Sequence, residues 1–123
     1  MNAPKKLTQV NKFELLTADF GEYGISSHEL YATEPSAKIS GGVAMFRDVA
    51  HEWTVWYDEI LFCHSVENFF EIIIDGTSQR MVPGDSVYLP AQTSLIYKST
   101  GTSVLFYTAT PVNWADDLEE NMR

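Results

Sequence analysis

Hydrophobic and polar residues alternate in short runs along residues 53–110, and turn residues separate the runs. Residues 53–57 (WTVWY) have the two-residue period of a β-strand. A second and a third strand are predicted at EILFCH and NFFEIIID, and Asp75-Gly76 predicts a hairpin between the third strand and SQRMV. Further short strands are predicted at PGDSVYLP, SLIYKS and TSVLFYTAT.

The segment before residue 53 has weaker strand signals. An edge strand is predicted at 12–17 (KFELLT) and another strand at 28–33 (HELYAT). In KISGGVAMF the pair Gly41-Gly42 interrupts the apolar run, as a β-bulge or a close backbone approach would. So many short strands in one small chain predict a β-sandwich or a closed barrel, and a barrel of this size can enclose one small ligand.

A chain of 123 residues forms one domain, and 45% hydrophobic residues are enough for a packed core. We expect a flexible N-terminal arm at 1–11, a single domain at 12–114 and an acidic tail at 115–123 that is irregular or a short helix. A net charge of −9 argues against a nucleic-acid partner. Cys63 is the one cysteine, which excludes an intramolecular disulfide and fits a reducing cytoplasm. No stretch resembles a leader or a membrane span, so no membrane association is expected.

Two motifs carry a resemblance to a known family. YDEILF and PGDSVYLP resemble the motif pair of the cupin superfamily, which implies an all-β jelly-roll barrel, also called a double-stranded β-helix. More narrowly, WTVWYDEILF, PGDSVYLP and the closing ATPVNW resemble ethanolamine-utilisation protein Q (EutQ) and its stand-alone relatives, from Ser40 to Trp114. The resemblance covers the cupin portion of such proteins, and we expect their additional N-terminal region to be absent.

Metal-binding cupins carry two histidines before a motif glutamate and a third histidine in the second motif. If Glu59 is the motif glutamate, the resemblance places the first pair on Glu52 and Thr54, or on Trp53 and Val55. The third position falls on Leu95, so no imidazole stands at any of them. Gln92 stands at the position where the second motif of cupins has a glycine.

The histidines elsewhere do not supply the missing ligands. His64 alternates with Glu59 along the predicted strand and should point away from it unless a bulge intervenes. His28 and His51 are expected in or beside loops. We therefore expect no metal and no other cofactor, although Glu52 with Glu59 could hold a hard divalent cation through oxygen. Whether Glu52 or Trp53 faces inward depends on a one-residue register that the sequence leaves open.

The predicted site is acidic and aromatic instead. Trp53, Tyr57, Glu59 and Tyr97 are the candidate ligand-binding residues, and Glu59 with Tyr57 are the candidate catalytic ones. Aromatic surroundings should desolvate the Glu59 carboxyl and raise its pKa toward the range of a general base, and the same group could attract a small cation. Alternatively, the rings belong to the barrel core and Glu59 lies at an exposed strand start.

Three functions remain open. The first is a metal-free cupin that binds an amine or a short carboxylate of ethanolamine or acetyl metabolism, as the family resemblance implies. The second is an enzyme that uses Glu59 as acid or base. The third is a non-catalytic partner protein of a bacterial microcompartment. A homodimer is expected, with Phe69, Phe70 and Phe106 either at its interface or in the core.

Overall fold

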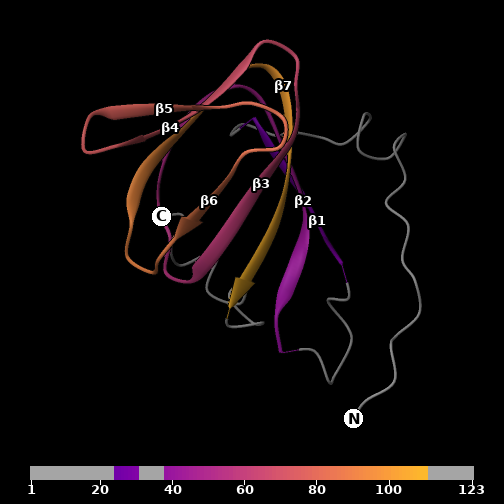
Figure 1. Cartoon of the computed structure of the whole chain (residues 1–123), viewed down its shortest axis with the longest axis vertical. Coiled ribbons are helices and arrows are strands. Elements are labelled where there is room, and N and C mark those ends of the chain that lie inside the picture. The colour runs from indigo at the N-terminus through magenta and orange to yellow at the C-terminus, as the bar shows by residue number, and fades with distance from the viewer. Residues whose placement is uncertain (1–23, 31–37, 111–123) are drawn as a thin grey trace.

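The structure, a computed structural model, describes residues 24–30 and 38–110. The expected arm at 1–11, the edge strand at 12–17 and the tail at 115–123 lie outside these residues. Within them the chain forms strands and no helix, as Figure 1 shows. The strands are β1 (Ile25–Leu30), β2 (Ser40–Thr54), β3 (Asp58–Val66), β4 (Phe69–Ile74), β5 (Thr77–Met81), β6 (Ser86–Leu89) and β7 (Ser94–Thr110).

All strand pairs are antiparallel, and β7 joins most of them. The order in the sheet is β1-β2-β7-β3-β6, with β4 paired to both β5 and β7. One edge of β7 pairs with β2, while the other edge pairs first with β4 and then with β3. In Figure 1 the sheet curls, and the β4–β5 hairpin projects beyond the neighbouring strands. The predicted all-β jelly-roll architecture is confirmed.

The inward face of the sheet follows the predicted alternation. Along β3, Glu59, Leu61 and Cys63 are buried, whereas Ile60 and Phe62 are exposed. Rings from three other strands meet in the core. The centroid of Phe46 lies 5.1 Å from that of Phe70 and 5.2 Å from that of Tyr97. Phe70 is therefore a core residue, whereas Phe69 is half-buried and Phe106 is exposed.

The bulge in β2 lies elsewhere than at Gly41-Gly42. Both glycines keep regular register with Thr108 and Tyr107 of β7, so the bulge alternative is wrong at this position. The close-approach alternative holds, because a Cβ added at Gly41 would lie 3.3 Å from the Tyr107 carbonyl oxygen. The register shift lies instead between Arg47 and Val49.

At that shift β2 and β7 turn a corner together. Asp48 and Gly101 both have positive φ, 45° and 74°. The Gly101 amide donates a 2.7 Å hydrogen bond to Asp48 Oδ1. The buried Ser99 hydroxyl donates to the Gly101 carbonyl at 2.9 Å and lies 2.8 Å from Ser103 Oγ. Side chains thus satisfy the backbone where the ladder is interrupted.

The sequence also predicts a strand through residues 53–57, and there the structure differs. Strand β2 ends at Thr54, β3 begins at Asp58, and residues 55–57 connect them. The cause is a long-range contact with the loop before β7. The Val55 amide donates to the Thr93 carbonyl at 3.0 Å, and the Gln92 amide donates to the Val55 carbonyl at 2.6 Å. The chain leaves the β2 ladder at Val55 to join this loop.

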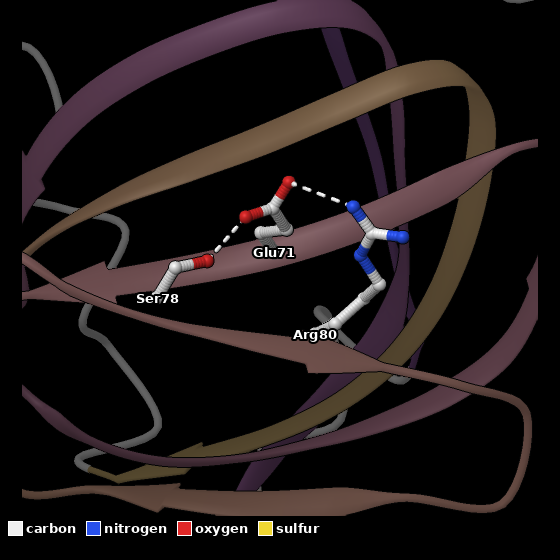
Figure 2. Close-up of polar contacts among 3 residues, drawn as sticks. All are labelled: Glu71, Ser78 and Arg80. Atoms are coloured by element: carbon white, nitrogen blue, oxygen red, sulfur yellow. Dashed lines mark hydrogen bonds and ion pairs between the residues drawn. The ribbon is translucent and has the colours of Figure 1, made fainter.

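The Asp75-Gly76 hairpin is confirmed, with positive φ at both residues. Figure 2 shows the polar contacts that hold its outer face: the Ser78 hydroxyl donates to Glu71, and Arg80 Nη2 lies 3.7 Å from Glu71 Oε1. The Arg80 guanidinium also lies 4.2 Å from the centroid of the Phe69 ring. These contacts join β5 to β4 and leave Arg80 engaged with the hairpin.

Gln92 occupies a backbone conformation that favours glycine. Its φ is 76°, in a turn closed by the Thr93 amide and the Pro90 carbonyl at 3.2 Å. We expect Gln92→Gly to raise the free energy of unfolding by about 0.5–1 kcal/mol, because it removes left-handed strain. Urea unfolding measures the change. Gln79→Gly, in the regular strand β5, is the matched control and should lower stability. A loss of stability in Gln92→Gly would contradict the prediction.

Candidate acidic and aromatic site

Glu59 is a buried carboxyl at the start of β3. It pairs with Leu89 of β6 and Ala109 of β7, and the pleat turns its side chain inward together with Leu61. Only 6% of the residue is exposed. The alternative of an exposed strand start is therefore wrong, because the neighbouring Asp58 takes the exposed position.

The two oxygens of this carboxyl differ in their partners. The Tyr97 hydroxyl donates to Oε1 at 3.3 Å. Oε2 accepts no hydrogen bond from the described residues. Every fully buried side-chain oxygen and nitrogen in these residues has a partner, so Oε2 is not fully enclosed. One carboxyl oxygen thus remains open to a donor that the described chain does not supply.

Burial sets the ionisation of the cluster. Desolvation raises the pKa of Glu59 to about 7, against the smaller opposing effect of the hydrogen bond from Tyr97. Burial, and after it the charge on Glu59, raises the pKa of Tyr57 and of Tyr97. Both phenols are therefore neutral donors near pH 7, whereas Glu59 changes its charge there.

The structure brings the four predicted site residues into one cluster. Trp53 Nε1 donates to the Tyr57 hydroxyl at 3.3 Å. The charge of Glu59 raises the pKa of Tyr57, and the Tyr97 hydroxyl donates to the Glu59 carboxyl. Trp53 is the residue before the last in β2 and Tyr57 lies in the connection, so the two do not share one strand as predicted. The inward register is settled for Trp53, which packs against the core, while Glu52 is exposed.

Tyr107 belongs to the cluster and escaped the sequence analysis. It is 5% exposed, it pairs with Leu61, and its charge interaction with Tyr57 contributes to the raised pKa of that phenol. Its hydroxyl lies 3.4 Å from Ser27 Oγ of β1. The signal was available, because Leu105, Tyr107 and Ala109 alternate on one face of TSVLFYTAT.

A row of rings continues from the cluster. The centroid of Trp53 lies 5.3 Å from His51 and 5.2 Å from Trp56, and Trp56 meets Tyr57 edge to face at 5.0 Å. We call His51, Trp53 and Trp56, all half-buried, the aromatic row. His51 lies within β2 rather than in or beside a loop, and burial lowers its pKa. His28 falls in β1, and its side chain is not among those described.

These donors do not fit a transition metal. In the part of the chain that the structure describes, no three His, Cys, Asp or Glu side chains gather. The Glu59 carboxyl has the Tyr97 hydroxyl as its contact, and Leu95, at the third histidine position of the cupin motif, is a core residue. His64 lies at a register shift of β3, is exposed, and contacts the Phe106 ring at 5.0 Å. A zinc or iron centre needs three or four convergent nitrogen, sulfur or carboxylate ligands.

Solved structures show the same fold at low sequence identity. The EutQ protein of Clostridium difficile has a TM-score of 0.67 and 23% identity over 74% of this chain and 65% of that chain. A putative ethanolamine utilization protein Q of Salmonella typhimurium has a TM-score of 0.65 and 19% identity, covering 72% of this chain and 71% of its own. Ectoine synthase from P. lautus has a TM-score of 0.70 and 14% identity, covering 92% and 85%.

A curated relative from Clostridioides difficile, described as acetate kinase EutQ, is 23% identical over 91 residues. The chain spans 57% of the length of that relative, and the match covers 74% of the chain itself. No helix in the described residues is long and apolar enough to cross a membrane. The family model described as ethanolamine utilisation protein EutQ matches residues 4–116. This chain therefore belongs to the EutQ family, and its fold is that of a cupin.

Proposed function

We propose that this EutQ-family cupin binds a small primary amine, with the Glu59 carboxylate as its charged partner. The observation that supports the proposal is the open oxygen Oε2 on a carboxyl that is otherwise buried. An ammonium group carries the donors and the charge that this oxygen lacks. The phenol and indole rings of the cluster could add attraction for a cation. The family name suggests ethanolamine as the first amine to test.

A short carboxylate is the competing ligand, and it would need the opposite state of Glu59. An ammonium pairs with the ionised carboxylate, whereas an anion would need the protonated acid as a donor, together with Tyr57 or Tyr97. Because the pKa of Glu59 is about 7, the two ligands predict opposite pH dependences. A cytoplasmic location is part of this proposal, and the free, buried Cys63 supports it because a reducing compartment keeps thiols unpaired.

Calorimetric titration at pH 6 and pH 8 tests the proposal. We expect ethanolamine to bind about tenfold more tightly at pH 8, where Glu59 is mostly ionised. Glu59→Gln should weaken binding by about 30-fold or more, since it removes one member of a buried charge pair. Glu52→Gln, at an exposed position, is the matched control and should bind as the parent does. If acetate binds more tightly at pH 6 than at pH 8 and ethanolamine does not bind, the ligand is a carboxylate and the amine proposal is wrong.

Acid–base catalysis is a second candidate, favoured by the same pKa near neutrality. The relative described as acetate kinase EutQ suggests the reaction to test, which is consumption of ATP with acetate. Activity that Glu59→Gln and Tyr57→Phe both reduce would support an enzyme. If ATP is consumed at the same background rate with and without acetate, the binding function stands alone.

A homodimer is proposed on the outer face of β3. Ile60, Phe62, Tyr88 and Phe106 are exposed there, and the register places Ile60 beside Tyr88 and Phe62 beside Phe106. These four side chains are uncharged although the chain has a net charge of −9, and Asp58 lies at the start of the same face of β3. In the proposed dimer a second copy packs the same four uncharged side chains against them, which would bury apolar area.

Light scattering after size exclusion measures the dimer. Phe62→Glu should raise its dissociation constant by about 30-fold or more, because it buries a charge against a second copy of the strip. Thr77→Glu, on the exposed β5 hairpin, is the control and should leave it unchanged. A parent protein that is monomeric at high micromolar concentration would refute the dimer.

A further inference from the structure

The aromatic row offers more surface than a two-carbon amine can use. Its rings are half-buried, whereas the neighbouring Tyr57 is only 4% exposed. Trp53 Nε1 is held by the Tyr57 hydroxyl, which fixes the indole next to the Glu59 cluster. Trp56 contacts both Trp53 and Tyr57. Two large indoles therefore lie side by side and partly uncovered, and both contact Tyr57 of the Glu59 cluster.

Ethanolamine can cover little of this surface, because it has only two carbons beside its polar groups. Indole faces bind other rings through offset or tilted contacts and by covering apolar area. Resting on the proposed amine-binding function, we infer that the amine held at Glu59 carries an aromatic ring, and that this ring lies against Trp53 and Trp56. The ligand class is an arylalkylamine, with its ammonium at Oε2 of Glu59.

A matched pair of ligands separates the two ends of the molecule. Ethylamine and 2-phenylethylamine share the ammonium and differ by the ring. At pH 8, titration calorimetry should show 2-phenylethylamine binding at least about tenfold more tightly. Trp56→Leu should remove most of that advantage while it changes ethylamine affinity by less than about threefold. Glu59→Gln should weaken both ligands by the same factor.

Fluorescence gives an independent readout. The chain has three tryptophans, so in a Trp114→Phe background the emission comes from Trp53 and Trp56. We expect 2-phenylethylamine to change this emission at saturation and ethylamine to leave it nearly unchanged. Trp56→Phe is the second variant if Trp56→Leu does not fold, as judged by a cooperative thermal transition. It should retain part of the advantage of the ring.

The outcomes distinguish this inference from the function beneath it. If both amines bind with equal affinity and both depend on Glu59, the arylalkylamine class is wrong and the amine-binding function stands. An advantage of the ring that survives in both Trp56→Leu and Trp53→Leu would likewise overturn the inference. If neither amine binds at millimolar concentration, the proposed function fails and the inference fails with it.

Discussion

Glu59→Gln should raise the free energy of unfolding by about 3 kcal/mol at pH 8 and should leave it nearly unchanged at pH 4. The reason is that burial raises the pKa of the Glu59 carboxyl from 4.5 to about 7. Below pH 4.5 the folded and the unfolded chain both hold the proton. Between pH 4.5 and about 7 only the unfolded chain releases it, so the free energy of unfolding falls as the pH rises. Above about 7 the folded chain carries the buried charge and the loss is complete.

Urea unfolding of the parent and the variant from pH 4 to pH 8 measures this difference. The parent should lose stability relative to Glu59→Gln across the window from 4.5 to 7, and the two curves should run parallel above it. Glu52→Gln serves as the control, because Glu52 is exposed and its replacement should not alter the pH profile. A variant that is less stable than the parent at pH 8 would show that the carboxylate is satisfied in the fold.

A stability cost at one residue bears on function. A buried carboxyl with an open oxygen lowers stability near neutral pH, where leucine or glutamine would not. Groups of this kind concentrate at binding and catalytic sites, where the strain or charge has a use. The predicted gain in stability of Glu59→Gln and its predicted loss of amine binding therefore both follow from the same buried carboxyl.

Gly101→Val should lower the free energy of unfolding by about 3 kcal/mol or more. Gly101 has a φ of 74°, which a β-branched residue adopts only with strain. A Cβ there would also lie 2.8 Å from Glu67 Oε1 and 3.0 Å from Glu67 Cβ. The substitution would displace the corner where the Gly101 amide binds Asp48.

Gly76→Val separates strain from steric clash. Gly76 has a φ of 78°, close to that of Gly101, but nothing lies within 4 Å of a Cβ added there. This control should lower the free energy of unfolding by about 1–2 kcal/mol, which is the cost of the left-handed conformation alone. Chemical denaturation of both variants gives the comparison. Equal losses would show that Glu67 moves aside without cost.

Local pattern predicted the features that depend on neighbours in sequence. The alternation of β3 placed Glu59 and Leu61 on one face, and Asp75-Gly76 placed the hairpin. The family motifs led to the curled all-β fold and to four residues of the cluster. These predictions hold because side-chain period and turn chemistry act over a few residues.

Features set by distant partners were missed. The strand signal of residues 53–57 is broken at Val55 by hydrogen bonds to the loop at 92–93, which no local pattern contains. The bulge was sought at Gly41-Gly42, yet it forms at Asp48, where a side chain binds the backbone of β7. Tyr107 joins the cluster because β7 and β3 align in one register. Each of these three features depends on contacts between residues more than thirty positions apart in the sequence.

Strand β7 has a consequence for how the protein is made. It supplies ladder partners to β2, β3 and β4, and it follows all three in the chain. While the ribosome is still translating residues 94–110, those earlier strands have unpaired edges. The sheet therefore cannot close until β7 has been synthesised. Before that point the nascent chain exposes unpaired strand edges, which makes misassembly most favourable then.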